Sequence, residues 1–112
     1  MKHIIAIVRP EKLDDVRHAL EKVGCSGLMI SEISGHGKQK GVVQQWRGEK
    51  YKVDLIPKIK LEVMIKDSEL DIIKKTIMEN ARTGEIGDGK MFISTVDEVV
   101  RIRTGEEGEI AL

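Results

Sequence analysis

The chain of 112 residues contains few of the residues that mark several common protein classes. Its single cysteine, Cys25, cannot form an internal disulfide, which fits a reducing cytoplasm. Three aromatic residues are too few for an RNA-binding sheet built on stacked bases. Nineteen basic and nineteen acidic residues cancel, which argues against a nucleic-acid partner. No apolar run approaches the roughly 20 residues of a membrane span. We therefore expect one cytoplasmic domain over residues 1–112.

The apolar residues that are present predict two β-α-β units. The first unit has a strand, a helix that starts after Pro10, and a second strand, over Lys2–Val8, Glu11–Val23 and Leu28–Ser34. The second has a strand, a helix that starts at a capping box, and two short strands, over Lys58–Lys66, Ser68–Asn80, Met91–Val96 and Glu98–Arg103. This order favours an α+β, ferredoxin-like βαββαβ sandwich with a short C-terminal strand. Its open sheet face and edges suggest self-association.

The segment Lys38–Asp54 between the two units has no sustained helical or strand period. It contains five basic and two acidic residues, a net charge of +3, and two of the three aromatic residues. Loops longer than about 12–15 residues in a compact domain are usually functional or disordered. We therefore expect a mobile basic arm.

A second glycine-rich segment runs from Gly84 to Lys90. Gly84, Gly89 and the following lysine match the spacing of a phosphate loop, but Met91 replaces the Ser or Thr, and a strand follows where a helix is required. The glycines still allow backbone N–H groups to approach a phosphate, and Lys90 adds a positive charge. The alternative is a simple turn between a helix and a strand.

Arg101 and Arg103 are two residues apart in the strand predicted at Glu98–Arg103, so both side chains would project from one face. Two guanidinium groups in fixed register suit a di- or triphosphate. Taken alone, the pair is more typical of surface charge.

The remaining candidates are weaker. The glycines from Gly35 to Gly41 do not match a dinucleotide-binding fingerprint and instead predict a hinge at which Lys38 and Gln39 could contact an anion. The three histidines show no metal-ligand spacing, and Cys25 is expected to be inert. No catalytic set is evident, which favours a binding or signalling protein.

Three blocks of sequence closely resemble the nitrogen-regulatory PII signalling proteins: TGEIGDGKMFI at 83–93, VRIRTGE at 100–106, and the loop from Gly37 to Tyr51 followed by VDLIPKIKLEV. The resemblance implies a ferredoxin-like homotrimer with a T-loop at about 37–55, a B-loop at about 83–90 and a C-loop at about 101–106. It further implies a sensor of ATP, ADP and 2-oxoglutarate in the cytoplasm. Such a sensor associates reversibly with the membrane through an ammonium transporter, and glutamine synthetase or other nitrogen-metabolism proteins are further candidate partners.

The resemblance also implies roles for individual residues. Lys58 would pair with a carboxylate of 2-oxoglutarate beside Gln39 and Gly87, and Gln39 would help to hold magnesium on the ATP. Arg47 would enter the transporter pore. Tyr51 is a candidate for modification, although the residues before it depart from the family pattern. The nucleotide would contact Met29, Gly37, Lys38, Gln39, Met64, Gly87, Asp88, Gly89, Lys90, Arg101, Ile102 and Arg103, with the C-loop arginines coming from a neighbouring subunit.

Two other functions remain open from the residues alone. A small phosphate-loop ATPase or phosphotransferase would use the Gly84–Lys90 loop, but it lacks an obvious base or nucleophile. A structural ferredoxin-like trimer would have no need for that loop or for the arginine pair.

Overall fold

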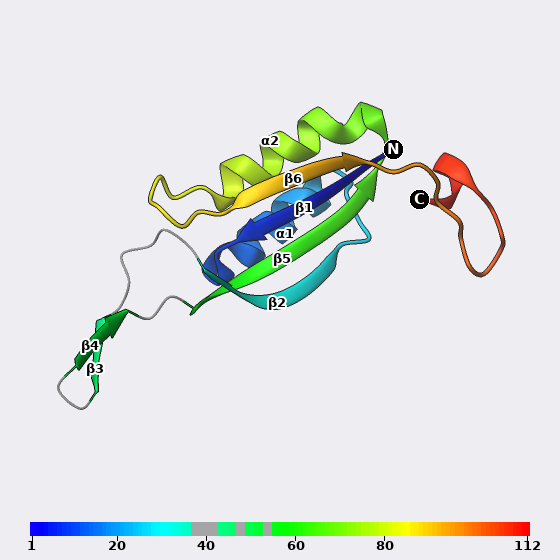
Figure 1. The fold of residues 1–112 in the computed structure, drawn as a ribbon. Coiled ribbons are helices and arrows are strands. Elements are labelled where there is room, and N and C mark those ends of the chain that lie inside the picture. Colours follow the sequence, from blue (N-terminus) through cyan, green and yellow to red (C-terminus); the bar gives the residue numbers. More distant parts are fainter. Residues whose placement is uncertain (37–42, 47–48, 53–54) are drawn as a thin grey trace.

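The computed structural model describes residues 1–36, 43–46, 49–52 and 55–112 (Figure 1). The two β-α-β units predicted from the sequence are present. The elements follow in the order β1 (Lys2–Val8), α1 (Leu13–Lys22), β2 (Met29–His36), β3 (Val43–Trp46), β4 (Glu49–Lys52), β5 (Leu55–Ile65), α2 (Leu70–Ala81) and β6 (Lys90–Thr95). Short 3-10 turns cover Pro10–Lys12, Asp67–Glu69 and Gly108–Ala111.

Four of the strands form one antiparallel sheet in the order β2-β5-β1-β6. Both helices cover the same face of this sheet (Figure 1). The architecture is therefore the predicted α+β, ferredoxin-like sandwich, with β2 and β6 at the edges of the sheet.

The core lies between the sheet and the helices because alternate strand residues point to the same side. Ile4, Ala6 and Val8 of β1 are buried, as are Ile59, Leu61, Val63 and Ile65 of β5. Val16, Leu20, Ile73 and Ile77 meet them from the two helices. The intervening residues face the open side, where Phe92 of β6 remains 56% exposed. One sheet face is thus open and partly apolar.

Local signals explain where the helices begin and end. Pro10 starts the turn that leads into α1, and Gly24 follows α1 with φ +81°, a conformation that favours glycine. The capping box predicted at Ser68–Asp71 is wrong. The carboxylate of Glu69 instead accepts the N–H of Lys66 at 3.0 Å, because the chain makes a 3-10 turn before α2.

Two further expectations need correction. The segment Lys38–Asp54 contains a pair of strands, since β3 and β4 form a separate two-stranded sheet in which Val43 lies opposite Lys52. The sequence does not predict them, because Glu49–Lys52 does not alternate between apolar and polar residues. The strand predicted at Glu98–Arg103 is absent. The chain turns there, with Gly105 at φ +73° donating its N–H to the carbonyl of Arg101 at 2.8 Å, and only an isolated bridge joins Val100 to Glu107.

Candidate functional site

The glycine-rich loop between α2 and β6 is closely fitted to the end of β1. Gly84, Gly87 and Gly89 have φ values of +92°, +104° and +96°, a region that side-chain-bearing residues rarely adopt. A Cβ atom on Gly89 would lie 1.7 Å from the carbonyl oxygen of Ile7. Position 89 therefore requires glycine both for its backbone angle and for its contact with β1.

The carboxylate of Asp88 lies inside the loop and organises it. One oxygen accepts the N–H groups of Thr83 and Gly84 at 2.8 and 2.9 Å, and the other accepts the Thr83 hydroxyl at 2.5 Å and Arg9 Nε at 3.0 Å. The Thr83 hydroxyl first, and then the backbone and Arg9 donors, hold the pKa of Asp88 far below its ordinary value. Because both oxygens are occupied, Asp88 shapes the loop rather than offering a free carboxylate to a ligand.

Arg9 is the residue of this site that sequence reasoning missed. It follows β1, donates from Nε to Asp88 and donates from Nη2 to the carbonyl of Ile86 at 2.9 Å. Its side chain is only 14% exposed. The sequence signal that could have identified Arg9 is its position directly before Pro10, at the end of the first predicted strand, where loops of a βαβ unit lie.

Lys58 of β5 approaches the loop from the open side of the sheet. Its Nζ donates a hydrogen bond to the carbonyl of Gly87. Burial and the neighbouring Arg9 cation lower the pKa of Lys58. Lys58 therefore places a cation against the glycine loop, whereas the charge of Arg9 is already paired with Asp88. A cation beside backbone N–H groups favours an anion.

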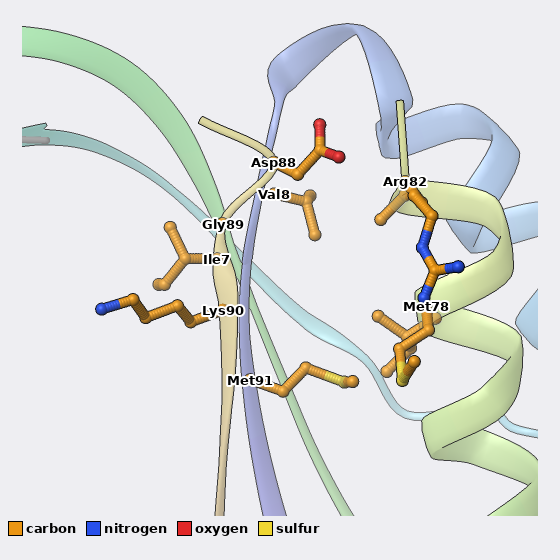
Figure 2. Close-up of a pocket in the computed structure, with 10 residues that line it drawn as sticks. Ile7, Val8, Met78, Arg82, Asp88, Gly89, Lys90 and Met91 are labelled. Carbon is orange, nitrogen blue, oxygen red and sulfur yellow. The ribbon is translucent and has the colours of Figure 1, made fainter. Parts of the chain in front are cut away.

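Two cavities flank the start of β6. The larger, about 740 Å³, is lined by loop residues together with Ile7, Lys58, Lys90 and Phe92. The smaller, about 250 Å³, lies between α2 and β6 and is largely apolar. Figure 2 shows Met91 pointing into it toward α2, while Lys90 points to the opposite side of β6. Lys58 and Lys90 line the larger cleft, whose size suits a small-molecule ligand, and Arg82 lines the smaller one.

The structure divides the residues predicted to bind nucleotide or 2-oxoglutarate into two groups. Lys58, Gly87, Asp88, Gly89 and Lys90 gather at the larger cleft. Met64 lies six residues farther along β5, about 20 Å from Lys58 at the usual strand rise. Met29 pairs with Glu62, so it also lies toward that far end, on the open face with Met64.

The C-terminal group lies beyond the far end of β6. Figure 1 places the C-terminal segment at the opposite end of the sheet from the glycine loop. Ile102 is 99% exposed there, and Arg103 is also exposed. The prediction that Arg101 and Arg103 share a strand face is wrong, because the chain turns at residues 102–104 and Arg101 pairs with Glu106 at 2.8 Å.

Several predictions fall on the segment between β2 and β5. Gly37, Lys38, Gln39 and Arg47 lie outside the described residues. The backbone of Tyr51 lies in β4, opposite Gln44. The roles implied for these residues stay predictions.

The remaining candidates of the sequence are Cys25 and the histidines. Cys25 is buried, and burial raises the pKa of its thiol, so it is a poor nucleophile. Among the described residues, no three His, Cys, Asp or Glu side chains gather as metal ligands. No helix within those residues has the length and apolarity to cross a membrane.

Fold and site together define a class: a ferredoxin-like α+β protein with a glycine loop and cationic side chains at one end of its sheet. The family model for nitrogen regulatory protein P-II matches residues 1–106, and this chain belongs to that family. Nitrogen regulatory protein P-II 2 of Methanothermobacter thermautotrophicus is 53% identical over 112 residues, which cover all of this chain and 97% of the relative. P-II proteins of Pasteurella multocida and Escherichia coli K12 are 50% and 49% identical over the full length of both chains. The family consists of regulatory signalling proteins and not of enzymes.

Proposed function

We propose that this protein senses nucleotides and 2-oxoglutarate and regulates an ammonium transporter through its 37–55 loop. The observation that carries this proposal is the cleft of about 740 Å³, which is lined by Lys58, Lys90 and the glycine loop. Backbone N–H groups and cations around glycines are the usual means of binding a di- or triphosphate. ATP and ADP are therefore the proposed ligands of this cleft.

The division of the predicted residues supports a site built from two copies of the chain. Met29, Met64, Arg101 and Arg103 lie toward one end of the sheet, and the glycine loop lies at the other. A second copy in a homotrimer would bring its far end to this cleft. The open sheet face, with the exposed Phe92, supplies apolar surface for that assembly.

The surroundings of Lys58 support a dicarboxylate beside the nucleotide. Its charge is partly desolvated and adjacent to Arg9, so an incoming carboxylate would relieve the repulsion between the two cations. We propose 2-oxoglutarate in this position. Asp88 has no free oxygen for magnesium, so the ion would be held by the phosphates and by Gln39. The bound magnesium would neutralise phosphate charge and offer the keto acid a place of attachment.

The 37–55 loop is the proposed contact with partners. Arg47 would enter the transporter pore, where a permanent cation with several donors can bind backbone carbonyls. Tyr51 is the proposed position of modification. The loop would bring the protein from the cytoplasm to the membrane only while the transporter is bound, and glutamine synthetase or related enzymes would be further partners.

Calorimetry with the purified protein tests the nucleotide site. ATP and ADP should bind the wild type, and Lys90→Ala and Arg103→Ala should each weaken ATP at least tenfold, about 1.4 kcal/mol. Lys22→Ala, an exposed lysine at the end of α1, serves as the matched control and should bind normally. Absence of ATP binding to the wild type would overturn the proposal. Titration of 2-oxoglutarate should give heat only when Mg-ATP is present.

A further inference from the structure

The segment that follows Val96 folds into a compact hook. The N–H of Arg101 donates to the carbonyl of Glu106 at 2.8 Å, and the N–H of Gly108 donates to the carbonyl of Val99 at 2.9 Å. Gly105 closes the turn by donating to the carbonyl of Arg101 at 2.8 Å. Backbone hydrogen bonds therefore fix the position from which the side chain of Arg101 projects.

The guanidinium of Arg101 is held from two sides of this hook. Nη1 donates to Glu106 Oε1 at 2.8 Å, and Nη2 donates to the carbonyl oxygen of Ile110 at 2.8 Å. The side chains of Arg101 and Glu106 are only about one-third exposed, at 36% and 35%. A guanidinium has five N–H donors, so these two bonds leave three for a ligand.

Neighbouring charges are not held in this way. Arg103 is exposed and has no ion-pair partner in the described part of the chain. Glu107 is adjacent in sequence to Glu106 and exposed, and its side chain makes no ion pair with any described residue. Within the hook, Arg101 and Glu106 are therefore held in an ion pair, and Arg103 and Glu107 are not.

We propose that Glu106 is a positioning residue that orients Arg101 for the phosphates of the nucleotide. The inference rests on the proposed function and adds to it the residue that prepares this guanidinium. An exposed arginine loses rotamer freedom when it binds a phosphate. A guanidinium that is already fixed loses less, so affinity rises without a new contact to the ligand.

The opposite role would give the opposite sign. If Glu106 merely competed with phosphate for Arg101, removing its carboxylate would tighten nucleotide binding. The geometry favours positioning because Glu106 accepts from Nη1 alone and the Ile110 carbonyl fixes Nη2. Nucleotide can therefore use the remaining donors while both bonds persist.

A double-mutant cycle measures whether Glu106 acts through Arg101. ATP affinity is measured by calorimetry for the wild type, Glu106→Ala, Glu106→Gln, Arg101→Ala and the Arg101→Ala/Glu106→Ala double variant. Glu106→Ala should weaken ATP about three- to tenfold, and Glu106→Gln should weaken it less because the amide oxygen still accepts from Nη1. In the Arg101→Ala background, Glu106→Ala should have no further effect. The matched control, Glu107→Gln, should bind as the wild type does.

A measurement without nucleotide separates this inference from the proposed function. In NMR spectra of the unliganded protein, the side-chain Nε–H of Arg101 should give a distinct resonance that Glu106→Ala averages and Glu107→Gln preserves. Tighter ATP binding by Glu106→Ala, or an equal loss in the Arg101→Ala background, would overturn the positioning role. An unchanged Arg101 resonance in Glu106→Ala would overturn the positioning role, whether or not the wild type binds ATP. Failure of the wild type to bind ATP would instead overturn the proposed nucleotide site.

Discussion

The carbonyl oxygen of Ile7 occupies the space that a side chain on Gly89 would need, 1.7 Å from the expected Cβ position. This contact joins the glycine loop to the central strand β1, since Ile7 pairs with Lys90 in the sheet. The loop is therefore anchored on the most buried part of the molecule.

Gly89→Ala should consequently destabilise the protein. The backbone angle of φ +96° and the clash with a backbone carbonyl together should lower the free energy of unfolding by about 2 kcal/mol or more. Gly84→Ala is the control, because Gly84 has a similar φ of +92° but nothing within 4 Å, so its cost should be about 1 kcal/mol. Urea unfolding of both variants checks the difference. Equal losses would mean that β1 yields to the added methyl group.

Asp88→Asn should loosen the loop without unfolding the domain. The amide retains one oxygen but cannot accept from Arg9, Thr83 and Gly84 together, so the N–H groups of Thr83 and Gly84 should exchange with solvent faster. Glu85→Gln, at the exposed tip of the same loop, is the matched control and should leave these rates unchanged. Hydrogen exchange followed by NMR makes the measurement. Unchanged protection in Asp88→Asn would contradict the organising role of this carboxylate.

The same carboxylate predicts how the loop responds to acid. Its folded pKa is lowered from the ordinary 3.8, so its stabilising contribution is fully present above that value and is lost only as the pH falls through the lower, folded pKa. Protection of the Thr83 N–H should therefore be the same at pH 7 and pH 5. NMR titration of the Asp88 carboxyl carbon gives the direct check, and a midpoint at or above 3.8 would refute the assignment.

Lys58 predicts a response of the opposite kind at high pH. Its pKa is lowered from 10.5 in the folded protein, so the charged form of Lys58 destabilises the fold. The free energy of unfolding should therefore rise as the pH increases from the folded pKa to 10.5, because the folded protein loses this charge first. An anion bound beside it should raise the pKa again and draw a proton onto Lys58. Calorimetry of 2-oxoglutarate with Mg-ATP at pH 9, in two buffers of different ionisation enthalpy, should reveal net proton uptake. Lys58→Met should abolish that uptake.

Most of the fold follows from the sequence because burial imposes a regular pattern. Ile59, Leu61, Val63 and Ile65 alternate strictly and are all buried, so the pattern predicts both the strand and its inward face. The cluster of Gly84, Gly87 and Gly89 likewise predicts the glycine loop. The hook was not, because Arg101 and Ile102 alternate as a strand would, while the turn depends on Gly105 and on a pairing of Arg101 with Glu106. Arg9 was missed for a similar reason: its partner Asp88 lies 79 residues away.

The open sheet face carries the last prediction, which concerns assembly. Phe92 is 56% exposed and lies on the same face as Ile5, its partner on β1, so a charge at this position should oppose association of the copies. The wild type should sediment as the proposed trimer in analytical ultracentrifugation, and Phe92→Glu should shift it to monomer. Ile72→Glu tests an equally apolar position, 48% exposed on the outer surface of α2, and should leave the trimer intact. The proposed nucleotide site requires two copies, and Phe92 also lines its cleft, so on both grounds the Phe92→Glu monomer should bind ATP at least tenfold more weakly. A monomer with undiminished affinity would show that one chain completes the site by itself.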